Sequence, residues 1–394
     1  MKFHVIGIDD SSELRLPANL SEVIERSRVF SGGERHRKIV EGILPANHTW
    51  IDIKPPMGEL FSRYSRYDEV VVFASGDPLF YGFGSTLQRY MPDAQMELYP
   101  TFNSLQILAH KAQIPYHDMR VISLTGRSWE RFDEALIMGE RVMGVLTDTK
   151  EHTPEKIAQR MLHYGYINYR LTVGEQLGNE NSERVESYSV EQAAESCFSH
   201  PSNIIMERTS LRRRPFGIAD NEFIPLNGRT AMITKMPIRM ALLSLMELRE
   251  SQTLWDVGFC TGSVSIEAKL QFPHLKVVSF EKREECREII EGNITQFGAL
   301  GIDYHIGDFM EQPLDGVPSP DVIFIGGHGG NLAAIVARCA KQLKEGGRLL
   351  FNSVSPESQA LFIDSAKQCA LSIEKMMDIQ VDEFNRIRII KTVK

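Results

Sequence analysis

In the second half of the sequence, an apolar strand runs directly into a glycine-containing loop and then into a helix. Residues 253–257 are apolar or β-prone, Gly258 and Gly262 follow, and a helical stretch begins after them. Glycine permits backbone angles and close backbone approaches that larger residues resist. In open α/β sheets, ligands bind at the carboxyl ends of the strands. We therefore expect a ligand loop at this position.

The spacing of the two glycines argues against a dinucleotide. A dinucleotide fingerprint reads G-x-G-x-x-G, whereas Cys260 occupies the middle of the stretch between Gly258 and Gly262 and no third glycine follows at the required distance. About 20 residues after the loop, Glu281 ends the next apolar strand, where a carboxylate in such folds hydrogen-bonds ribose hydroxyls. The pattern fits S-adenosylmethionine (SAM) better than NAD.

Two further strand ends support the same ligand site. A third apolar stretch ends at Gly307 and Asp308, and a fourth, residues 321–325, runs into a glycine cluster that contains His328. A single glycine loop between strand and helix is common in any α/β protein and often holds no ligand. Unusual residues at four successive strand ends indicate one shared crevice more strongly.

A second loop of the same kind lies in the first half of the chain. Residues 70–73 form a continuous apolar strand, and Gly76, Asp77 and Pro78 follow it before a helical stretch. One interpretation is a plain turn, in which Gly provides unusual backbone angles, Asp bonds nearby amides and Pro fixes the exit. The position of the turn between strand and helix makes it a second candidate ligand loop.

Strand and helix signals alternate on both sides of one irregular segment. Regular periodicity stops between about residues 208 and 235, where proline and glycine accumulate, and we interpret this segment as a linker. The predicted architecture is two successive α/β domains, residues 1–207 and 208–394. Further strands of the first domain are expected at residues 96–99, 120–124, 142–146 and 171–173.

Composition sets outer bounds on function. A chain of 394 residues is long enough for two domains, and it contains no apolar run that could span a membrane. The five cysteines are scattered without a C-x-x-C pair, which suits a reducing cytoplasm and predicts no metal site. The net charge of −8 argues against general affinity for nucleic acid. We expect a cytoplasmic homo-oligomer that binds neither membrane nor nucleic acid.

Several motifs resemble known methyltransferases. "SGDPLFYGFG", "PTFNSLQILAHKAQIPYHD", "SLTGR" and "LTVGEQLG" resemble the class III, tetrapyrrole-type methyltransferases, in particular the cobalamin-pathway enzymes that methylate carbon 5. "MITK", "IRMALLSL", "LWDVGFCTGSVSIEA", "DVIFIGG" and "LLFNSVSPES" resemble the class I methyltransferases that act on carbon 15 of the same corrin precursor. Their order resembles the fused C5,15-methyltransferases, which also decarboxylate, and the resemblance covers nearly the whole chain.

The resemblance implies a fold, a cofactor and a set of site residues. The implied fold is an N-terminal tetrapyrrole-methylase-like α/β domain that methylates carbon 5, followed by a Rossmann-like class I domain that methylates carbon 15 and decarboxylates the carbon 12 acetate. Each domain is expected to bind SAM. The candidate cofactor residues are Gly76, Asp77, Pro78, Thr234, Asp256, Gly258, Cys260, Gly262, Glu281, Gly307 and Asp308. The candidate substrate residues are Lys235, Arg239 and His328.

The substrate candidates follow from the chemistry that the resemblance implies. A macrocycle that bears many carboxylates favours Lys and Arg around the pocket. Lys235 and Arg239 can equally be ordinary surface charges, and His328 can be a solvent-facing loop residue. The chain departs from the family at Asp9, Cys260 and Thr125, and the sequence identifies no general acid or base. A reactive role for Cys260 is disfavoured because no histidine lies nearby in sequence.

Two other functions fit parts of this pattern. The class I half could methylate RNA, protein or another small molecule, although the acidic balance of the chain counts against nucleic acid. One or both sites could instead bind SAM without turnover, as a sensor does. The sequence does not distinguish a cobalt-containing from a cobalt-free substrate.

Overall fold

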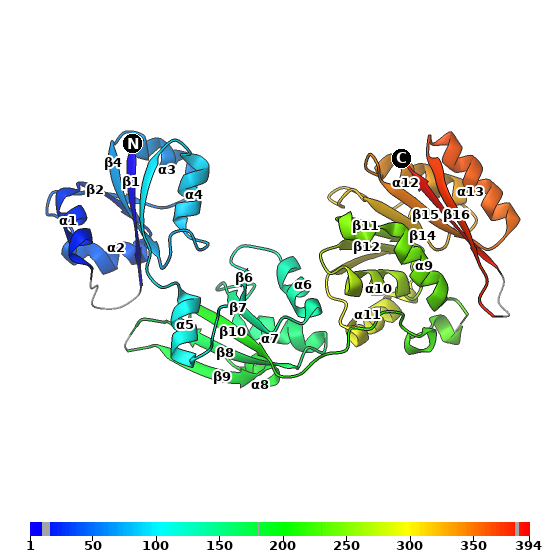
Figure 1. The fold of residues 1–394 in the computed structure, drawn as a ribbon, viewed down its shortest axis with the longest axis horizontal. Coiled ribbons are helices and arrows are strands. Elements are labelled where there is room, and N and C mark those ends of the chain that lie inside the picture. Colours follow the sequence, from blue (N-terminus) through cyan, green and yellow to red (C-terminus); the bar gives the residue numbers. More distant parts are fainter. Residues whose placement is uncertain (10–15, 180, 230, 383–385) are drawn as a thin grey trace. The chain divides into compact units, whose positions relative to one another are not determined.

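The computed structural model describes the chain except residues 10–15, 180, 230 and 383–385. Backbone packing divides the described chain into two compact units. The first unit comprises Met1–Arg127, Arg141–Gln159 and Tyr169–Thr209, and the second comprises Ser128–Glu140, Arg160–Asn168 and Ser210–Lys394. Three β-sheets organise these units (Figure 1), and the expected succession of α/β folds is confirmed.

The first sheet is parallel throughout and has the strand order β3-β2-β4-β1-β5. Its strands are β1 (Lys2–Ile8), β2 (Val29–Gly32), β3 (Thr49–Asp52), β4 (Glu69–Ser75) and β5 (Gln95–Tyr99). Its helical segments are α1 (Ala18–Arg26), α2 (Glu34–Val40), η1 (Glu41–Ile43), α3 (Met57–Tyr64) and α4 (Phe83–Tyr90). Because all strands run in one direction, their carboxyl ends meet at one edge of the sheet.

Side chains along the central strands of this sheet alternate between its two faces, and each face packs against different helices. Phe3 and Val5 of β1 pack in one core with side chains of α3 and α4, whereas Ile6 and Ile8 pack in another with α1 and α2. Figure 1 labels these four helices around the sheet. Successive side chains of a strand point to opposite faces, so a strand that is buried on both sides reads as a continuous apolar run. This accounts for the strong strand signal at residues 70–73.

The second sheet is mixed and has the order β6-β7-β10-β8-β9. Its strands are β6 (Arg120–Ser123), β7 (Val142–Leu146), β8 (Tyr169–Glu175), β9 (Arg184–Ser189) and β10 (Ser202–Arg208). The helices along this stretch of chain are α5 (Ser104–Ala112), α6 (Glu130–Met138), α7 (Pro154–His163) and α8 (Val190–Glu195). Only β6 and β7 are parallel, while β10 pairs antiparallel with both β7 and β8. The sequence did not indicate β9, β10 or this antiparallel pairing.

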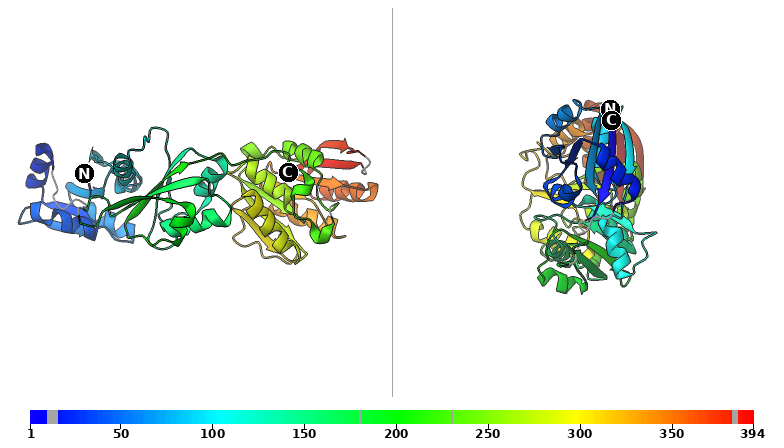
Figure 2. Two further views of the ribbon diagram at one scale, coloured as in Figure 1. Left: turned by 90° about the horizontal axis from the view of Figure 1, so that it is seen from below. Right: turned by 90° about the vertical axis from the view of Figure 1, so that its left-hand side faces the viewer.

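The third sheet belongs to the second unit and has the order β13-β12-β11-β14-β15-β17-β16. Its strands are β11 (Thr253–Val257), β12 (Lys276–Glu281), β13 (Ile302–Ile306), β14 (Val322–Ile325), β15 (Arg348–Ser353), β16 (Ser372–Ile379) and β17 (Ile387–Val393). Its helical segments are α9 (Met236–Met246), η4 (Leu248–Glu250), α10 (Ser263–Gln271), α11 (Cys286–Phe297), α12 (Leu332–Gln342) and α13 (Pro356–Gln368). Figure 2 shows β16 and β17 in red, close to α13 in orange.

The order of this sheet places a topological switch between β11 and β14. From β11 the chain proceeds to β12 and β13 on one side, and then returns to β14 on the other side of β11. Crevices form at the carboxyl ends of the two strands that flank such a switch. Trp255 and Val257 face α12 and α13 across one core, while Ser265 of α10 contacts Asp256 on the opposite face.

The segment interpreted as a linker is more ordered than its sequence indicated. Strand β10 extends to Arg208, and the short helices η2 (Asp220–Glu222) and η3 (Leu226–Gly228) follow. Ile218, Phe223 and Leu226 are buried within the second unit. Their spacing matches neither a helix nor a strand, so periodicity gave no sign of their burial. None of the described helices is both long and apolar enough to cross a lipid bilayer.

Candidate functional sites

The first unit contains a cavity of about 530 Å³ at the carboxyl ends of the first sheet. Ile8 and Asp9 at the end of β1, Gly33 after β2, and Ser75 and Gly76 at the end of β4 line one part of it. Residues 146–149 at the end of β7 and residues 200–203 before and within β10 line another. The expected ligand loop after residues 70–73 therefore lies on a cavity.

Gly76 joins the ends of three strands. Its amide donates to the carbonyl of Ile8 over 2.9 Å, and its carbonyl accepts from the amide of Thr101 over 3.3 Å. Its φ of +60° lies in the left-handed region, and a Cβ there would stand 2.8 Å from the Cα of Asn103. Glycine is required at this position by the close approach of the backbone, and Gly76 also lines the cavity.

Asp77 and Pro78 shape the turn and are not among the residues that line this cavity. The Asp77 carboxylate accepts a hydrogen bond of 2.8 Å from the amide of Leu79, as an Asx turn does. The Pro78 carbonyl accepts from the amide of Gly84, and a Cβ on Gly82 would stand 2.6 Å from that carbonyl oxygen. The structure thus brings only Gly76 of these three candidates to the cavity.

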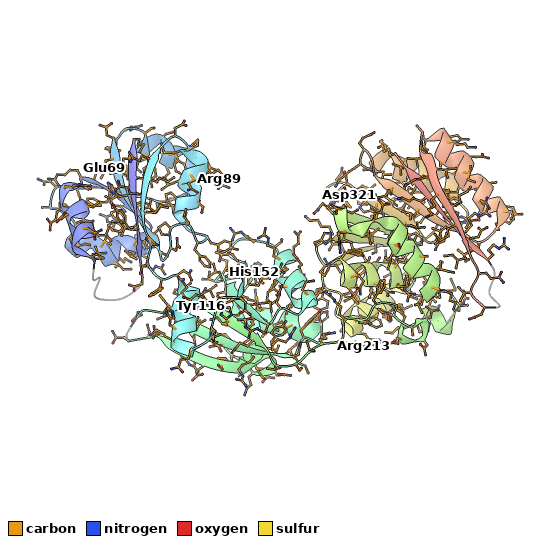
Figure 3. The ribbon with its side chains drawn as sticks, viewed as in Figure 1. Glu69, Arg89, Tyr116, His152, Arg213 and Asp321 are labelled. Carbon is orange, nitrogen blue, oxygen red and sulfur yellow. The ribbon has the colours of Figure 1, made fainter. Side chains whose placement is uncertain are left out.

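Aromatic rings line part of this cavity, and they belong to Phe80, Tyr81, Phe83 and Phe102. The carboxylates among its lining residues are Asp9 and Asp148. The amides of Lys150 and His152 donate to the Asp148 carboxylate, and the ring of His152 donates to it over 2.6 Å. His152 is labelled in Figure 3. Burial raises the pKa of Asp148, but these hydrogen bonds outweigh it and leave the pKa well below its usual range.

Two neighbouring cavities of the second unit share three lining residues. The larger, of about 380 Å³, lies between the segment 231–238 and the ends of β11, β14 and β15. The smaller, of about 200 Å³, lies over the ends of β11, β12 and β14. Gly258, Arg283 and Gly327 line both. The two cavities therefore meet at the switch point of the sheet.

Gly258 and Gly327 bring two loops into close backbone contact. A Cβ on Gly258 would stand 2.6 Å from the amide nitrogen of Gly327, and the φ of Gly258 is +81°. Gly262 lines neither cavity, and a Cβ there would meet the side chain of Ile290 at 2.9 Å. Gly307 also lines neither cavity, and its amide donates to the Glu281 carbonyl. Of these candidates, only Gly258 reaches the cavities.

Asp256 lies at the floor of the larger cavity with one unpaired oxygen. Its Oδ2 accepts a hydrogen bond of 2.6 Å from Ser265, whereas its Oδ1 is buried and has no partner among the described residues. Burial raises the pKa of Asp256 to about 7, and the neighbouring Glu281 contributes to the rise. A cationic donor in the cavity would supply the missing partner.

Two other residues of the cavity lining have a buried polar atom without a partner among the described residues. The atoms are Thr261 Oγ1 and Asn352 Oδ1, and both residues line the cavity with Asp256. An unpaired buried polar atom costs about 1–3 kcal/mol. Three such atoms around one cavity indicate a ligand that offers hydrogen bonds. Sequence reasoning did not single out Thr261 or Asn352, because an isolated Thr or Asn carries no spacing signal.

Glu281 stabilises the loop that borders both cavities. Its Oε2 accepts from the amide of Cys260 over 3.0 Å, and its Oε1 accepts from the amides of Lys282 and Arg283 over 2.8 and 3.1 Å. The side chain is 4% exposed and lines the smaller cavity. An ionised carboxylate offers about four acceptor positions, so one remains for a ligand hydroxyl.

Cys260 lines the larger cavity in a left-handed conformation, with a φ of +52°. Its thiol donates to the Met232 carbonyl over 3.3 Å, and the guanidinium of Arg283 lies 3.7 Å from its sulfur. A hydrogen bond from Cys286, together with the charge of Arg283, lowers the pKa of Cys260 despite its burial. Cys260 thus forms part of the cavity wall.

The remaining candidates are distributed over both cavities and the protein interior. Thr234 and Lys235 line the larger cavity, whereas Asp308 and His328 line the smaller one. The Asp308 carboxylate accepts from Lys282 Nζ over 2.8 Å, which lowers its pKa. His328 Nδ1 accepts from the amide of Gly330.

Arg239 is fully buried and lines neither cavity. Its guanidinium donates to the carboxylates of Glu267 and Asp220 and to the carbonyls of Thr234 and Ile218. All of these acceptors belong to the protein, so Arg239 holds the segment before α9 against α10. The expectation that Arg239 meets substrate does not agree with this position.

Two protein-family models match the chain. One, described as tetrapyrrole (corrin/porphyrin) methylases, matches residues 3–194. The other, described as a precorrin methyltransferase domain, matches residues 228–392. A precorrin-6Y C(5,15)-methyltransferase (decarboxylating) from a Sinorhizobium species is 31% identical over 366 residues, which are 91% of this chain and 86% of the relative.

Two shorter relatives come from Salmonella typhimurium. A cobalt-precorrin-6B C(15)-methyltransferase (decarboxylating) is 37% identical over 133 residues, which are 34% of this chain and 68% of the relative. A cobalt-precorrin-7 C(5)-methyltransferase is 31% identical over 182 residues, which are 45% of this chain and 86% of the relative. Each of the two activities in the name of the long relative thus also occurs in a separate, shorter protein.

Proposed function

The chain belongs to the precorrin-6Y C(5,15)-methyltransferase (decarboxylating) family, and from this premise we propose that it methylates a precorrin at carbons 5 and 15 and decarboxylates it, as a step of cobalamin biosynthesis. The observation that carries the proposal is one strand-end cavity system in each unit of a chain that matches a bifunctional relative over 91% of its length. No described feature favours the alternative of RNA or protein methylation.

Both chemical steps can be written with atoms in balance. Replacement of a ring C–H by C–CH3 releases one proton, because the methyl group arrives as a cation equivalent. Loss of CO2 from an acetate side chain leaves a methylene that takes up one proton to become a methyl group. One methylation therefore supplies the proton that the decarboxylation consumes. SAM, when bound, supplies an activated methyl group, so the protein chiefly has to hold the reacting atoms in line.

In the second unit, the described residues fit SAM. Asp256 and Asn352 line the larger cavity, and the Oδ1 atom of each has no partner among the described residues, so these two acceptors would hold the ammonium group of the cofactor. The adjoining smaller cavity would hold the nucleoside, with the remaining acceptor position of Glu281 for a ribose hydroxyl. In this arrangement the shared residues Gly258 and Gly327 would lie between the two ends of the cofactor.

In the first unit, we propose that the 530 Å³ cavity holds both SAM and the macrocycle. Gly76 would bring the backbone close to the cofactor, and Asp77 and Pro78 would keep the turn in shape. The aromatic rings on the cavity wall suit a flat conjugated ring. Among the substrate candidates of the second unit, Lys235 and His328 line the cavities and keep their proposed role.

The division of labour follows from the two family models. Residues 1–207 would methylate carbon 5, and residues 208–394 would methylate carbon 15 and decarboxylate, since the precorrin methyltransferase match lies wholly in the latter. Incubation of the full-length protein with precorrin-6Y and methyl-labelled SAM tests the function. The expected product gains two labelled methyl groups and loses one CO2 by mass spectrometry. A product without any label contradicts the proposal.

A further inference from the structure

Three polar side chains from distant segments meet on the wall of the cavity in the first unit. They are Arg35 and His36 in the first turn of α2 and Ser75 at the end of β4, and all three line the cavity. Arg35 NH2 donates to Ser75 Oγ over 2.8 Å, and His36 Nε2 lies 2.9 Å from the same oxygen. Neither the sequence patterns nor the family match assigned a role to this cluster.

The backbone fixes which ring nitrogen of His36 carries the proton. The amide of Gly33 donates to His36 Nδ1 over 3.4 Å, so Nδ1 is an acceptor. Burial, together with the charge of Arg35, lowers the pKa of His36 to about 4 against the opposing effect of a hydrogen bond to the Phe73 backbone, and the ring is neutral near pH 7. A neutral imidazole has one donor and one acceptor nitrogen, so Nε2–H donates to Ser75 Oγ.

The hydroxyl of Ser75 is therefore oriented. A serine oxygen has two acceptor lone pairs and one donor hydrogen, and Arg35 and His36 occupy both lone pairs. The O–H of Ser75 has no acceptor among the described residues, and the side chain is exposed on the cavity wall. The cluster presents an O–H donor, polarised by a guanidinium, to whatever occupies the cavity.

We propose that Arg35 and Ser75 form a carboxylate-binding subsite of the first cavity, with His36 as the residue that positions the serine hydroxyl. The inference rests on the proposed function, since a precorrin carries several carboxylate side chains and SAM carries one carboxylate. Arg35 contributes positive charge beside the donor, which suits a carboxylate better than a neutral carbonyl. Two carboxylates line the same cavity. The oxygens of Asp148 already accept from residues 150–152, and Asp9 also has an interaction of its own.

Steady-state kinetics of carbon 5 methylation by the full-length protein test the subsite. Ser75→Ala removes the donor and is expected to raise a KM about tenfold or more, whereas Ser75→Thr keeps the hydroxyl and is expected to stay near the wild type. Arg35→Ala is expected to act in the same direction as Ser75→Ala. Arg37→Ala is the matched control, because Arg37 is exposed on the same helix and does not line the cavity.

The parameter that changes identifies the source of the carboxylate. A higher KM for the macrocycle alone assigns the subsite to a substrate side chain, and a higher KM for SAM alone assigns it to the cofactor. His36→Gln retains an N–H donor near the Nε2 position and is expected to keep a lower KM than His36→Ala, which separates positioning from a general packing defect.

The outcomes distinguish this inference from the proposed function. If the wild type methylates carbon 5 and Ser75→Ala and Arg35→Ala leave both KM values unchanged, the subsite is wrong and the function stands. If the wild type fails to methylate carbon 5, the proposed function itself is wrong for the first unit. If Ser75→Ala does not fold, the contrast between Arg35→Ala and Arg37→Ala gives the same decision.

Discussion

Asp256 is the residue at which pH should control ligand binding in the second unit. Burial raises its pKa to about 7, so the carboxyl of the ligand-free protein is partly protonated near neutral pH. A ligand ammonium beside Oδ1 favours the ionised form. We expect the affinity for S-adenosylhomocysteine at this site to increase as the pH rises through 7, with proton release on binding. Calorimetry in buffers of different ionisation enthalpy measures both effects.

The same residue should reduce stability at higher pH when no ligand is present. The pKa of Asp256 is higher in the folded than in the unfolded chain, so the folded state binds the extra proton and its stability falls as the pH rises from about 4 to 7. Asp256→Asn carries no charge and removes this loss, which amounts to at most about 4 kcal/mol for a shift of that size. Chemical denaturation at pH 5 and pH 8 should show a smaller difference for Asp256→Asn than for the wild type.

A substitution at Thr261 tests whether the ligand contacts one of the three buried polar atoms without a partner among the described residues. Thr261→Val has nearly the same shape but lacks the buried hydroxyl, which has no partner among the described residues. We expect the ligand-free variant to be more stable by about 1 kcal/mol, because no unpaired polar atom remains, and to bind S-adenosylhomocysteine more weakly. An unchanged affinity together with increased stability would mean that the ligand does not contact this hydroxyl.

At the scale of elements, the loop after β11 depends on contact between two backbones. Gly258→Ala would place a Cβ 2.6 Å from the amide nitrogen of Gly327 and strain a φ of +81°. We expect a loss of stability of about 1–3 kcal/mol and loss of carbon 15 methylation. Gly316→Ala is the control, since Gly316 has nearly the same φ, +80°, but a Cβ there meets nothing within 4 Å and the residue lines neither cavity. Equal effects of both changes would assign the loss to backbone strain alone.

The two strands with the strongest sequence signal are buried on both faces of parallel sheets. Residues 70–73 and 253–257 are continuous apolar runs within β4 and β11, and short-range patterning is enough to identify them. Strand β9 was missed because its residues are largely exposed and mixed in character. Strand β10 was missed because its start follows an irregular stretch and its end lies in the segment interpreted as a linker. Its antiparallel pairing with β7 and β8 depends on contacts far apart in sequence.

The candidate site residues divide in the same way: those marked by a local sequence pattern were predicted, and those that meet only in the folded chain were not. Strand-end position predicted Gly76, Asp256, Gly258 and Glu281 beside cavities, since the carboxyl ends of parallel strands converge. The cluster of Arg35, His36 and Ser75 was not predicted, because its members come from two strand–helix units and meet only in the folded sheet. Asn352 was missed because nothing in its local sequence marks an unpaired amide oxygen.

In the whole molecule, each methylation is expected to take place in its own cavity. Thr125 in the first unit and Val354 in the second are both exposed residues that line a cavity. Thr125→Trp and Val354→Trp should therefore fill one cavity each without disturbing a buried core. Near-wild-type unfolding transitions by circular dichroism should establish that both variants remain folded.

Product analysis of these two variants tests the separation of the two activities most directly. Each variant is given SAM and either precorrin-6Y or a macrocycle that already carries the carbon 15 methyl group, so that the order of the steps cannot conceal an active cavity. We expect Thr125→Trp to methylate carbon 15 and decarboxylate but to leave carbon 5 unmethylated, and Val354→Trp to methylate only carbon 5. Loss of both methylations in either folded variant, on both substrates, would contradict this separation.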